Sequence, residues 1–198
     1  MLVWLMIIAG VIFLDQLSKW LTVTNLEYHE FIPDTIPVIK DVFHFTYVRN
    51  EGAAFSMFSA PDQRWIFMSI STIAIIALAV YLWKVRNKST LLCVGLSFII
   101  GGGIGNMIDR IALKYVIDML DFRLINFAIF NVADSFVCVG VGLFALYVII
   151  DEIKEYKKDK SAKVEISIEN NVSENSEESA ENVDINIESD SVNAEENE

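Results

Sequence analysis

Four long runs of apolar residues dominate the chain, at residues 2–23, 65–83, 91–108 and 136–150. A helix needs about 20 mainly apolar residues to cross the hydrocarbon core of a bilayer. The first three runs approach this length, and the fourth reaches it if it begins near Asn131. The first run has no basic segment before it and carries Asp15 and Lys19 in its second half, which favours a retained helix over a cleaved signal peptide. The pattern therefore predicts a membrane protein with four transmembrane helices.

The segment between the first two runs has a different pattern. Residues 31–47 alternate apolar and polar side chains, with Pro33 and Pro37 as breaks, and residues 42–48 are rich in β-branched and aromatic side chains. This pattern is typical of strands. We expect an outer β element at about residues 28–60, forming a small sheet within a membrane domain that covers residues 1–155.

The charge of the chain is unevenly distributed. The sequence is 54% hydrophobic, above the roughly 45–50% usual for soluble domains, yet its net charge is −12. No Lys or Arg follows Lys163, whereas twelve of the 27 acidic residues do, so the rest of the chain is formally neutral. Residues 161–198 also lack aromatic side chains. Such a segment buries too little apolar area to order itself, so we predict a disordered acidic tail and expect no nucleic-acid partner.

Basic residues in short loops predict the orientation. The loop at 84–88 is basic, and five lysines follow the fourth run between residues 154 and 163. Short basic segments stay on the cytoplasmic side of a membrane. Both termini and the acidic tail are therefore predicted to be cytoplasmic, and residues 25–64 and 111–131 to face outward. The small sheet is then extracytoplasmic.

Several ionisable residues lie within the apolar runs, where each costs about 2.5–3.5 kcal/mol at the centre of a membrane helix. Asp15 and Lys19 are four residues apart and share a helix face. They form either a structural ion pair, with Lys19 reaching toward the interface, or a support for a neighbouring polar site. Asp109 and Arg110 end the third run, and Gly101 and Gly105 before them form a GxxxG face that admits a close neighbouring helix.

Two further acids, Asp118 and Asp134, lie at similar predicted membrane depth. Asp134 opens the fourth helix, where an acid also suits the helix dipole, and Asp118 is flanked by apolar residues. Two carboxylates held together share a proton, and such a pair can hydrolyse an amide by general acid–base chemistry without a metal or cofactor. Intramembrane acids also mark ion pathways, so a proton- or ion-coupled transporter is the alternative. The two histidines and two cysteines lack the clustering of a zinc site.

Five motifs occur in order along the four runs. They are Asp-Gln-Leu-Ser-Lys (15–19), Asn-Glu-Gly-Ala-Ala-Phe-Ser (50–56), Gly-Asn-Met-Ile-Asp-Arg (105–110), Val-Ile-Asp-Met (116–119) and Phe-Asn-Val-Ala-Asp-Ser (130–135). The ordered set is far more specific than any one motif. It spans about residues 1–150 and resembles the lipoprotein signal peptidases, or signal peptidase II.

The resemblance implies an aspartic endopeptidase of the bacterial cell membrane, with its active site near the outer face. It would remove signal peptides from diacylglyceryl-modified prolipoproteins by cleaving before the lipid-modified cysteine. Membrane lipid is the other expected partner, a monomer is expected, and no cofactor is implied.

By motif position, Asp118 and Asp134 match the catalytic dyad of the family. Asp109 is the rival acid, and Asp118 is favoured because Asp109 stands beside Arg110 and reads better as structural. The positions that match pocket and supporting residues of the family are Asn50, Gly52, Asn106, Arg110, Asn131, Ala133, Asp15 and Lys19.

Overall fold

The computed structural model describes residues 1–51, 61–161 and 163. Within these residues, four helices are long and apolar enough to cross a membrane. They are α1 (Leu2–Asn25), α2 (Pro61–Val85, with its candidate membrane span at Met68–Val85), α3 (Thr90–Ala112) and a fourth helix, Val132–Ser161. The predicted number of spanning helices is confirmed.

Of the four helices, the fourth extends furthest beyond the apolar run that predicted it. It begins at Val132, directly after Asn131, and continues through the charged residues as far as Ser161. Residues 151–161 are rich in Glu and Lys and contain no Gly or Pro, so nothing local ends the helix at the close of the apolar run. The chain divides into the units Met1–Tyr147 and Val148–Glu198. From residue 164 onward, the predicted acidic tail lies outside the described residues.

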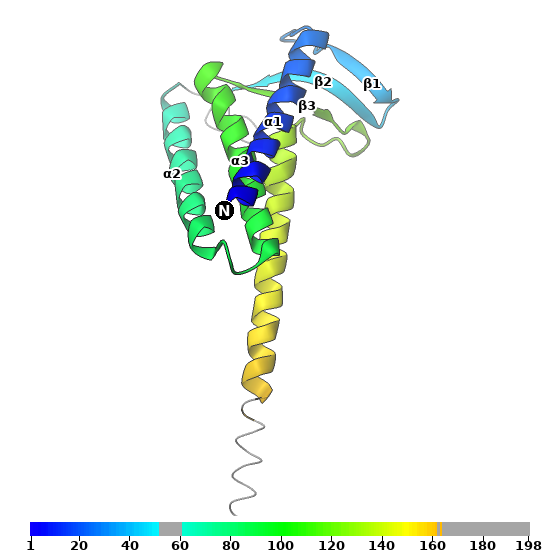
Figure 1. The fold of residues 1–198 in the computed structure, drawn as a ribbon. Coiled ribbons are helices and arrows are strands. Elements are labelled where there is room, and N and C mark those ends of the chain that lie inside the picture. Colours follow the sequence, from blue (N-terminus) through cyan, green and yellow to red (C-terminus); the bar gives the residue numbers. More distant parts are fainter. Residues whose placement is uncertain (52–60, 162, 164–198) are drawn as a thin grey trace, which may run out of the picture. The chain divides into compact units, whose positions relative to one another are not determined.

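A three-stranded antiparallel sheet completes the first unit (Figure 1). Its strands are β1 (Thr35–Ile39), β2 (Phe43–Asn50) and β3 (Val116–Asp121), in the spatial order β1-β2-β3. The first two confirm the expected β element. Strand β3 was not predicted from the sequence and is the main addition to the expected sheet. Proline is tolerated at position 37 because β1 is an edge strand.

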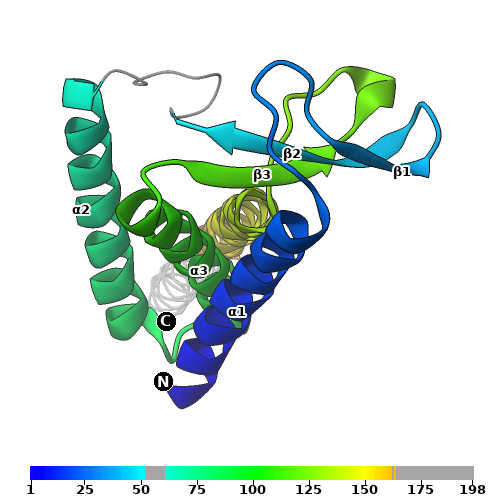
Figure 2. The ribbon, with the colours of Figure 1, turned by 90° about the horizontal axis from the view of Figure 1, so that it is seen from above.

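Within this unit, α3 lies between α1 and α2, and the sheet lies across one end of α1 and α3 (Figure 2). The glycine face of α3 makes the close contact with α1. A Cβ added at Gly101 would come 2.8 Å from Cβ of Val11, and one at Gly105 would come 2.6 Å from a carboxylate oxygen of Asp15. The predicted GxxxG contact is therefore confirmed.

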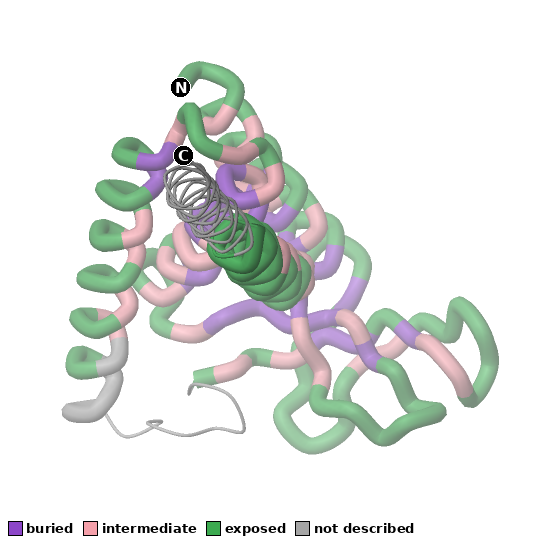
Figure 3. The backbone as a smooth tube through the Cα atoms, turned by 90° about the horizontal axis from the view of Figure 1, so that it is seen from below, coloured by how far each residue is buried: buried purple, intermediate pink, exposed green. Residues whose placement is uncertain are grey.

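The outer faces of the helices are exposed (Figure 3), and many of the exposed side chains are large and apolar. Leu2 and Phe13 on α1 are 71% and 63% exposed, and Ile73 on α2 is 67% exposed. By contrast, α3 has most of its apolar span buried inside the protein. Continuous apolar surface of this kind fits helices whose outer faces contact lipid.

Candidate active site

The start of the fourth helix places Asp134. Asn131 is the residue before the helix, and its side-chain oxygen accepts a bond from the backbone N–H of Asp134 at 3.0 Å. In return, the Asp134 carboxylate accepts from the backbone N–H of Asn131 at 3.3 Å. This reciprocal arrangement is a capping box, which satisfies two backbone donors at the helix end. The local role predicted for Asp134, an acid in the first helical turn, is confirmed, and the cap also fixes its carboxylate.

Strand β3 places Asp118, whose side chain is 2% exposed. One carboxylate oxygen accepts from the amide of Asn131 at 2.7 Å, and the other accepts from the amide of Asn50 at 2.9 Å. Burial raises the pKa of Asp118 to about 6, and the charge of Asp134 acts in the same direction. The bonds from Asn50 and Asn131 oppose the rise because they stabilise the charged form. Asp118 therefore holds a proton in a pH range where an ordinary carboxyl is ionised.

Two amide side chains connect the two carboxylates. Asn106 of α3 donates to Asp134 at 2.8 Å and accepts from Asn131 at 3.0 Å, while Asn131 also donates to Asp118. Asn131 is fully buried and uses both amide hydrogens in these bonds. Residues far apart in the sequence thus hold the two acids in one hydrogen-bonded array.

A cavity of about 570 Å³ opens onto this array. Its polar lining includes Asn50, Asn106, Arg110, Asp118 and Asp134, and much of the remaining wall is apolar, from residues 127–130 and 137–139. A cavity of this size, mostly apolar with a few convergent polar groups, is typical of a ligand-binding site.

Behind the cavity, Lys19 is buried among polar side chains. Its ammonium lies 2.8 Å from Asp15, 2.9 Å from Asp109 and 3.0 Å from the side-chain oxygen of Asn106. The side chain is 2% exposed, so the expectation that Lys19 reaches toward the interface is wrong. It points inward because two buried carboxylates and an amide oxygen compensate its charge.

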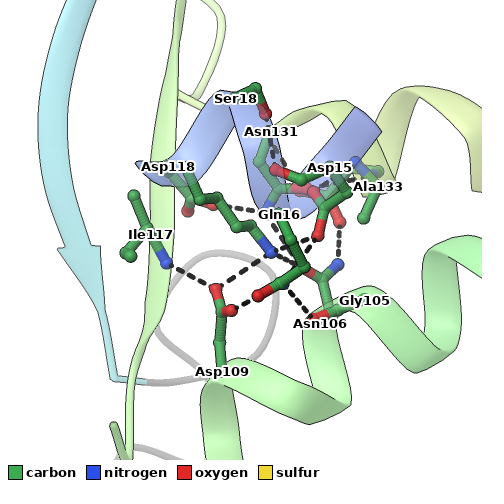
Figure 4. Close-up of polar contacts among 12 residues, drawn as sticks. Asp15, Gln16, Ser18, Gly105, Asn106, Asp109, Ile117, Asp118, Asn131 and Ala133 are labelled. Atoms are coloured by element: carbon green, nitrogen blue, oxygen red, sulfur yellow. Dashed lines mark hydrogen bonds and ion pairs between the residues drawn. The ribbon is translucent and has the colours of Figure 1, made fainter. Parts of the chain in front are cut away.

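Asp15 and Asp109 are fixed by further bonds (Figure 4). Asp15 accepts from the backbone N–H of Ala133 at 2.9 Å, which ties α1 to the start of the fourth helix. Asp109 accepts from Gln16 at 3.0 Å and from the backbone N–H of Ile117 at 3.1 Å, which ties α3 to β3. Gln16 belongs to the first motif, but this role was not predictable from local sequence because its partner lies 93 positions away.

The rival acid Asp109 therefore lies in the buried cluster and is absent from the lining of the cavity. Asp109 was expected to be structural because of the neighbouring Arg110, whereas its ion pair is with Lys19. Arg110 lines the cavity and donates to the backbone oxygen of Asn106 at 3.2 Å. Gly52, a predicted pocket residue, lies outside the described residues. Among the residues that are described, no group of three His, Cys, Asp or Glu side chains is placed to hold a metal ion.

First, the fold resembles that of solved bacterial membrane enzymes. A solved structure described as a bacterial membrane enzyme at 2.3 Å resolution has a TM-score of 0.69 and 30% identity, and the match covers 76% of this chain and 89% of that one. A second such structure, at 1.9 Å resolution, has a TM-score of 0.65, also at 30% identity, with 74% and 92% coverage.

Second, a family model described as signal peptidase (SPase) II matches residues 7–150. The chain is 43% identical to the lipoprotein signal peptidase of Brevibacillus brevis, over 75% of this chain and 96% of that protein. It is 39% identical to that of Bacillus subtilis, over 77% and 97%. The chain belongs to the signal peptidase II family. It is a multi-pass membrane peptidase of lipoprotein processing, and the transporter alternative is not favoured.

Proposed function

We propose that the protein is an intramembrane aspartic endopeptidase with Asp118 and Asp134 as its catalytic dyad. Its substrates are diacylglyceryl-modified bacterial prolipoproteins, cleaved before the lipid-modified cysteine. The observation that carries this proposal is the pair of carboxylates on one apolar cavity, joined through Asn131 and Asn106, with one of the two deeply buried. The names of the relatives support the substrate class.

The two environments suggest how the pair divides the reaction. Asp134, half-buried at the helix start, accepts a proton from water, and the water oxygen bonds to the scissile carbonyl carbon. Protonated Asp118 donates its proton to the carbonyl oxygen, giving a neutral tetrahedral intermediate. The carbon–nitrogen bond then breaks, the leaving nitrogen takes the proton held by Asp134, and Asp118 regains its proton from the intermediate hydroxyl. No cofactor takes part in this scheme.

The other predicted site residues act around this pair. Asn50, Asn106 and Asn131 orient the carboxylates through the bonds described above. Arg110 and Gly52 contact the substrate, an assignment that rests on motif position and, for Arg110, on its place in the cavity wall. The supporting residues Asp15 and Lys19 hold Ala133 and Asn106 in place, and Asp109 belongs with them.

The proposed topology places both termini in the cytoplasm and the sheet and dyad near the outer face. Its support is the basic segment at 84–88 and the lysines after residue 153. Residues 1–155 form the peptidase domain, and the acidic residues that follow it are cytoplasmic. The domain acts as a monomer, and lipid contacts the apolar outer faces of its helices.

A cleavage assay tests the proposal. Purified protein in detergent receives a diacylglyceryl-modified prolipoprotein and, as a control, the same protein without the modification. We expect cleavage of the modified substrate alone, unaffected by metal chelators or by deletion of the chain after Lys160. Cleavage of neither substrate contradicts the peptidase proposal.

Amide variants of three acids test the dyad. Asp118→Asn and Asp134→Asn each remove a group that transfers a proton, so cleavage is expected to fall by at least about 10²-fold. Asp109→Asn still offers an oxygen to Lys19 and is expected to retain most activity. Loss of cleavage in Asp109→Asn with activity kept in Asp118→Asn overturns the assignment.

A further inference from the structure

Arg49, near the end of β2, lies in a cage of three tyrosines. Its guanidinium carbon is 3.9 Å from the ring centre of Tyr28, 4.8 Å from that of Tyr115 and 5.7 Å from that of Tyr47. Its Nε also donates to the hydroxyl of Tyr47 at 3.2 Å. All three centroid distances are within the roughly 6 Å over which a cation is attracted to a ring face. No role in the dyad or its supporting cluster explains this arrangement.

The cage joins three segments that are separate in the sequence. Tyr28 lies between α1 and β1, Tyr47 lies in β2, and Tyr115 directly precedes β3. Tyr47 is 2% exposed and packs in a core cluster with Leu26, the residue directly after α1, so its ring is held in place. Tyr28 contacts Tyr47 edge to face at 5.7 Å. One arginine side chain thus holds the end of β2 against the start of β3 and the segment after α1.

The cage lies next to the dyad along the strand. Arg49 pairs with Ile117 and Asn50 pairs with Val116 in the β2–β3 register. Neighbouring strand residues point to opposite faces, so the cage grips one face while Asn50 presents its amide from the other. Asn50 is the last residue of β2, where a strand frays most readily, and its amide donates to Asp118.

We propose that Arg49 is a positioning residue, which sets the amide of Asn50 on the Asp118 carboxylate by clamping the end of β2 among Tyr28, Tyr47 and Tyr115. The inference rests on the proposed function for its kinetic readout, but the position of Asn50 also has a readout that needs no substrate. The bond from Asn50 lowers the pKa of Asp118, so a displaced Asn50 lets that pKa rise. A residue that serves only general stability would not shift this titration.

The central experiment is an infrared titration of the Asp118 carboxyl in detergent, with the band identified by its loss in Asp118→Asn. Arg49→Gln is expected to move the titration upward by about half a pH unit, and Asn50→Ala by about one unit, since the hydrogen bond that is weakened or lost stabilises the charged form of Asp118. Arg49→Lys keeps a cation near the rings and is expected to restore part of the difference. Lys40→Gln, which removes an exposed cation from the turn between β1 and β2, serves as the matched control and should leave the titration of Asp118 unchanged.

Cleavage kinetics supply the second readout. Arg49→Gln is expected to lower kcat about tenfold with KM changed less than about twofold, because the defect is in the dyad. In an Asn50→Ala background, Arg49→Gln should cause no further loss of kcat, since Arg49 acts through Asn50. Additive losses in the double variant, or an unmoved titration in Arg49→Gln, overturn the inference. If the wild-type protein cleaves no prolipoprotein, the proposed function fails, and the infrared titration still decides the role of Arg49.

Discussion

Replacing Asp118 with Asn is predicted to stabilise the folded protein at neutral and alkaline pH while it abolishes cleavage. The carboxyl has an ordinary pKa of 3.8 in the unfolded chain and about 6 in the folded protein. Between these values, the folded state holds a proton that the unfolded state has released. The free energy of unfolding therefore falls as pH rises from 3.8 to about 6, and it stays at the lower value at higher pH. An uncharged Asn removes the penalty of burying the charge.

The size of the effect follows from the two pKa values. At 1.36 kcal/mol for each pH unit, the ionised carboxyl costs about 3 kcal/mol at pH 8, but only about 0.5 kcal/mol at pH 4. The Asn side chain loses one acceptor site among the amides of Asn50 and Asn131, which costs about 1 kcal/mol at either pH. The hydrogen-bond cost is the same at both pH values, whereas the cost of the buried charge is not, so the stability of Asp118→Asn relative to wild type should rise by about 2.5 kcal/mol from pH 4 to pH 8.

Thermal unfolding in detergent, followed by tryptophan fluorescence, measures this difference. For a chain of this size about 1 kcal/mol corresponds to 2–4 °C, so the variant should gain roughly 5–10 °C on wild type between the two pH values. Glu30→Gln, at an exposed acid, is the matched control and should show no such pH-dependent gain. A Tm difference for Asp118→Asn that is equal at pH 4 and pH 8 would contradict a pKa raised by burial.

Three other substitutions test the surrounding structure. Gly105→Ala should lower Tm by several degrees because its Cβ would meet the buried aspartate of α1 at 2.6 Å, whereas Gly10→Ala, with nothing within 4 Å, should not lower it. Lys19→Met leaves buried carboxylates without their cation and should cost about 3–5 kcal/mol, seen as loss of folded protein on size-exclusion chromatography. Asp134→Asn removes a neighbouring negative charge, so the infrared titration of Asp118 should move to lower pH, and an upward shift would contradict the coupling between them.

Much of the architecture was predictable from local patterns. Apolar runs near the length of a bilayer marked all four helices, because lipid demands a continuous apolar surface whatever the neighbouring segments are. The alternating pattern marked β1 and β2, and the glycine spacing marked the face of α3 that meets α1. These features depend on residues close together in the sequence.

Strand β3 was not predictable in the same way. Its residues Val116–Asp121 are buried almost throughout, so they carry little of the alternation that identifies a half-exposed strand. They become a strand because the end of α3 delivers them beside β2, with Asp109 accepting from the backbone of Ile117. The ion pair of Lys19 with Asp15 was predictable from their spacing, but its second partner, Asp109, was hidden because Asp109 comes from another helix.

Local hydropathy therefore predicts the four membrane-spanning helices, and the ordered motifs point to the acids Asp118 and Asp134. The tertiary structure determines how those acids are held, through Asn131 and Asn106 at the edge of a shared cavity. It also decided which acids are neutralised by Lys19 and which line the cavity. Hydropathy is a property of each segment alone, so it can be read from neighbouring residues. A buried polar group instead takes its partner from whichever segment folding brings within about 3 Å.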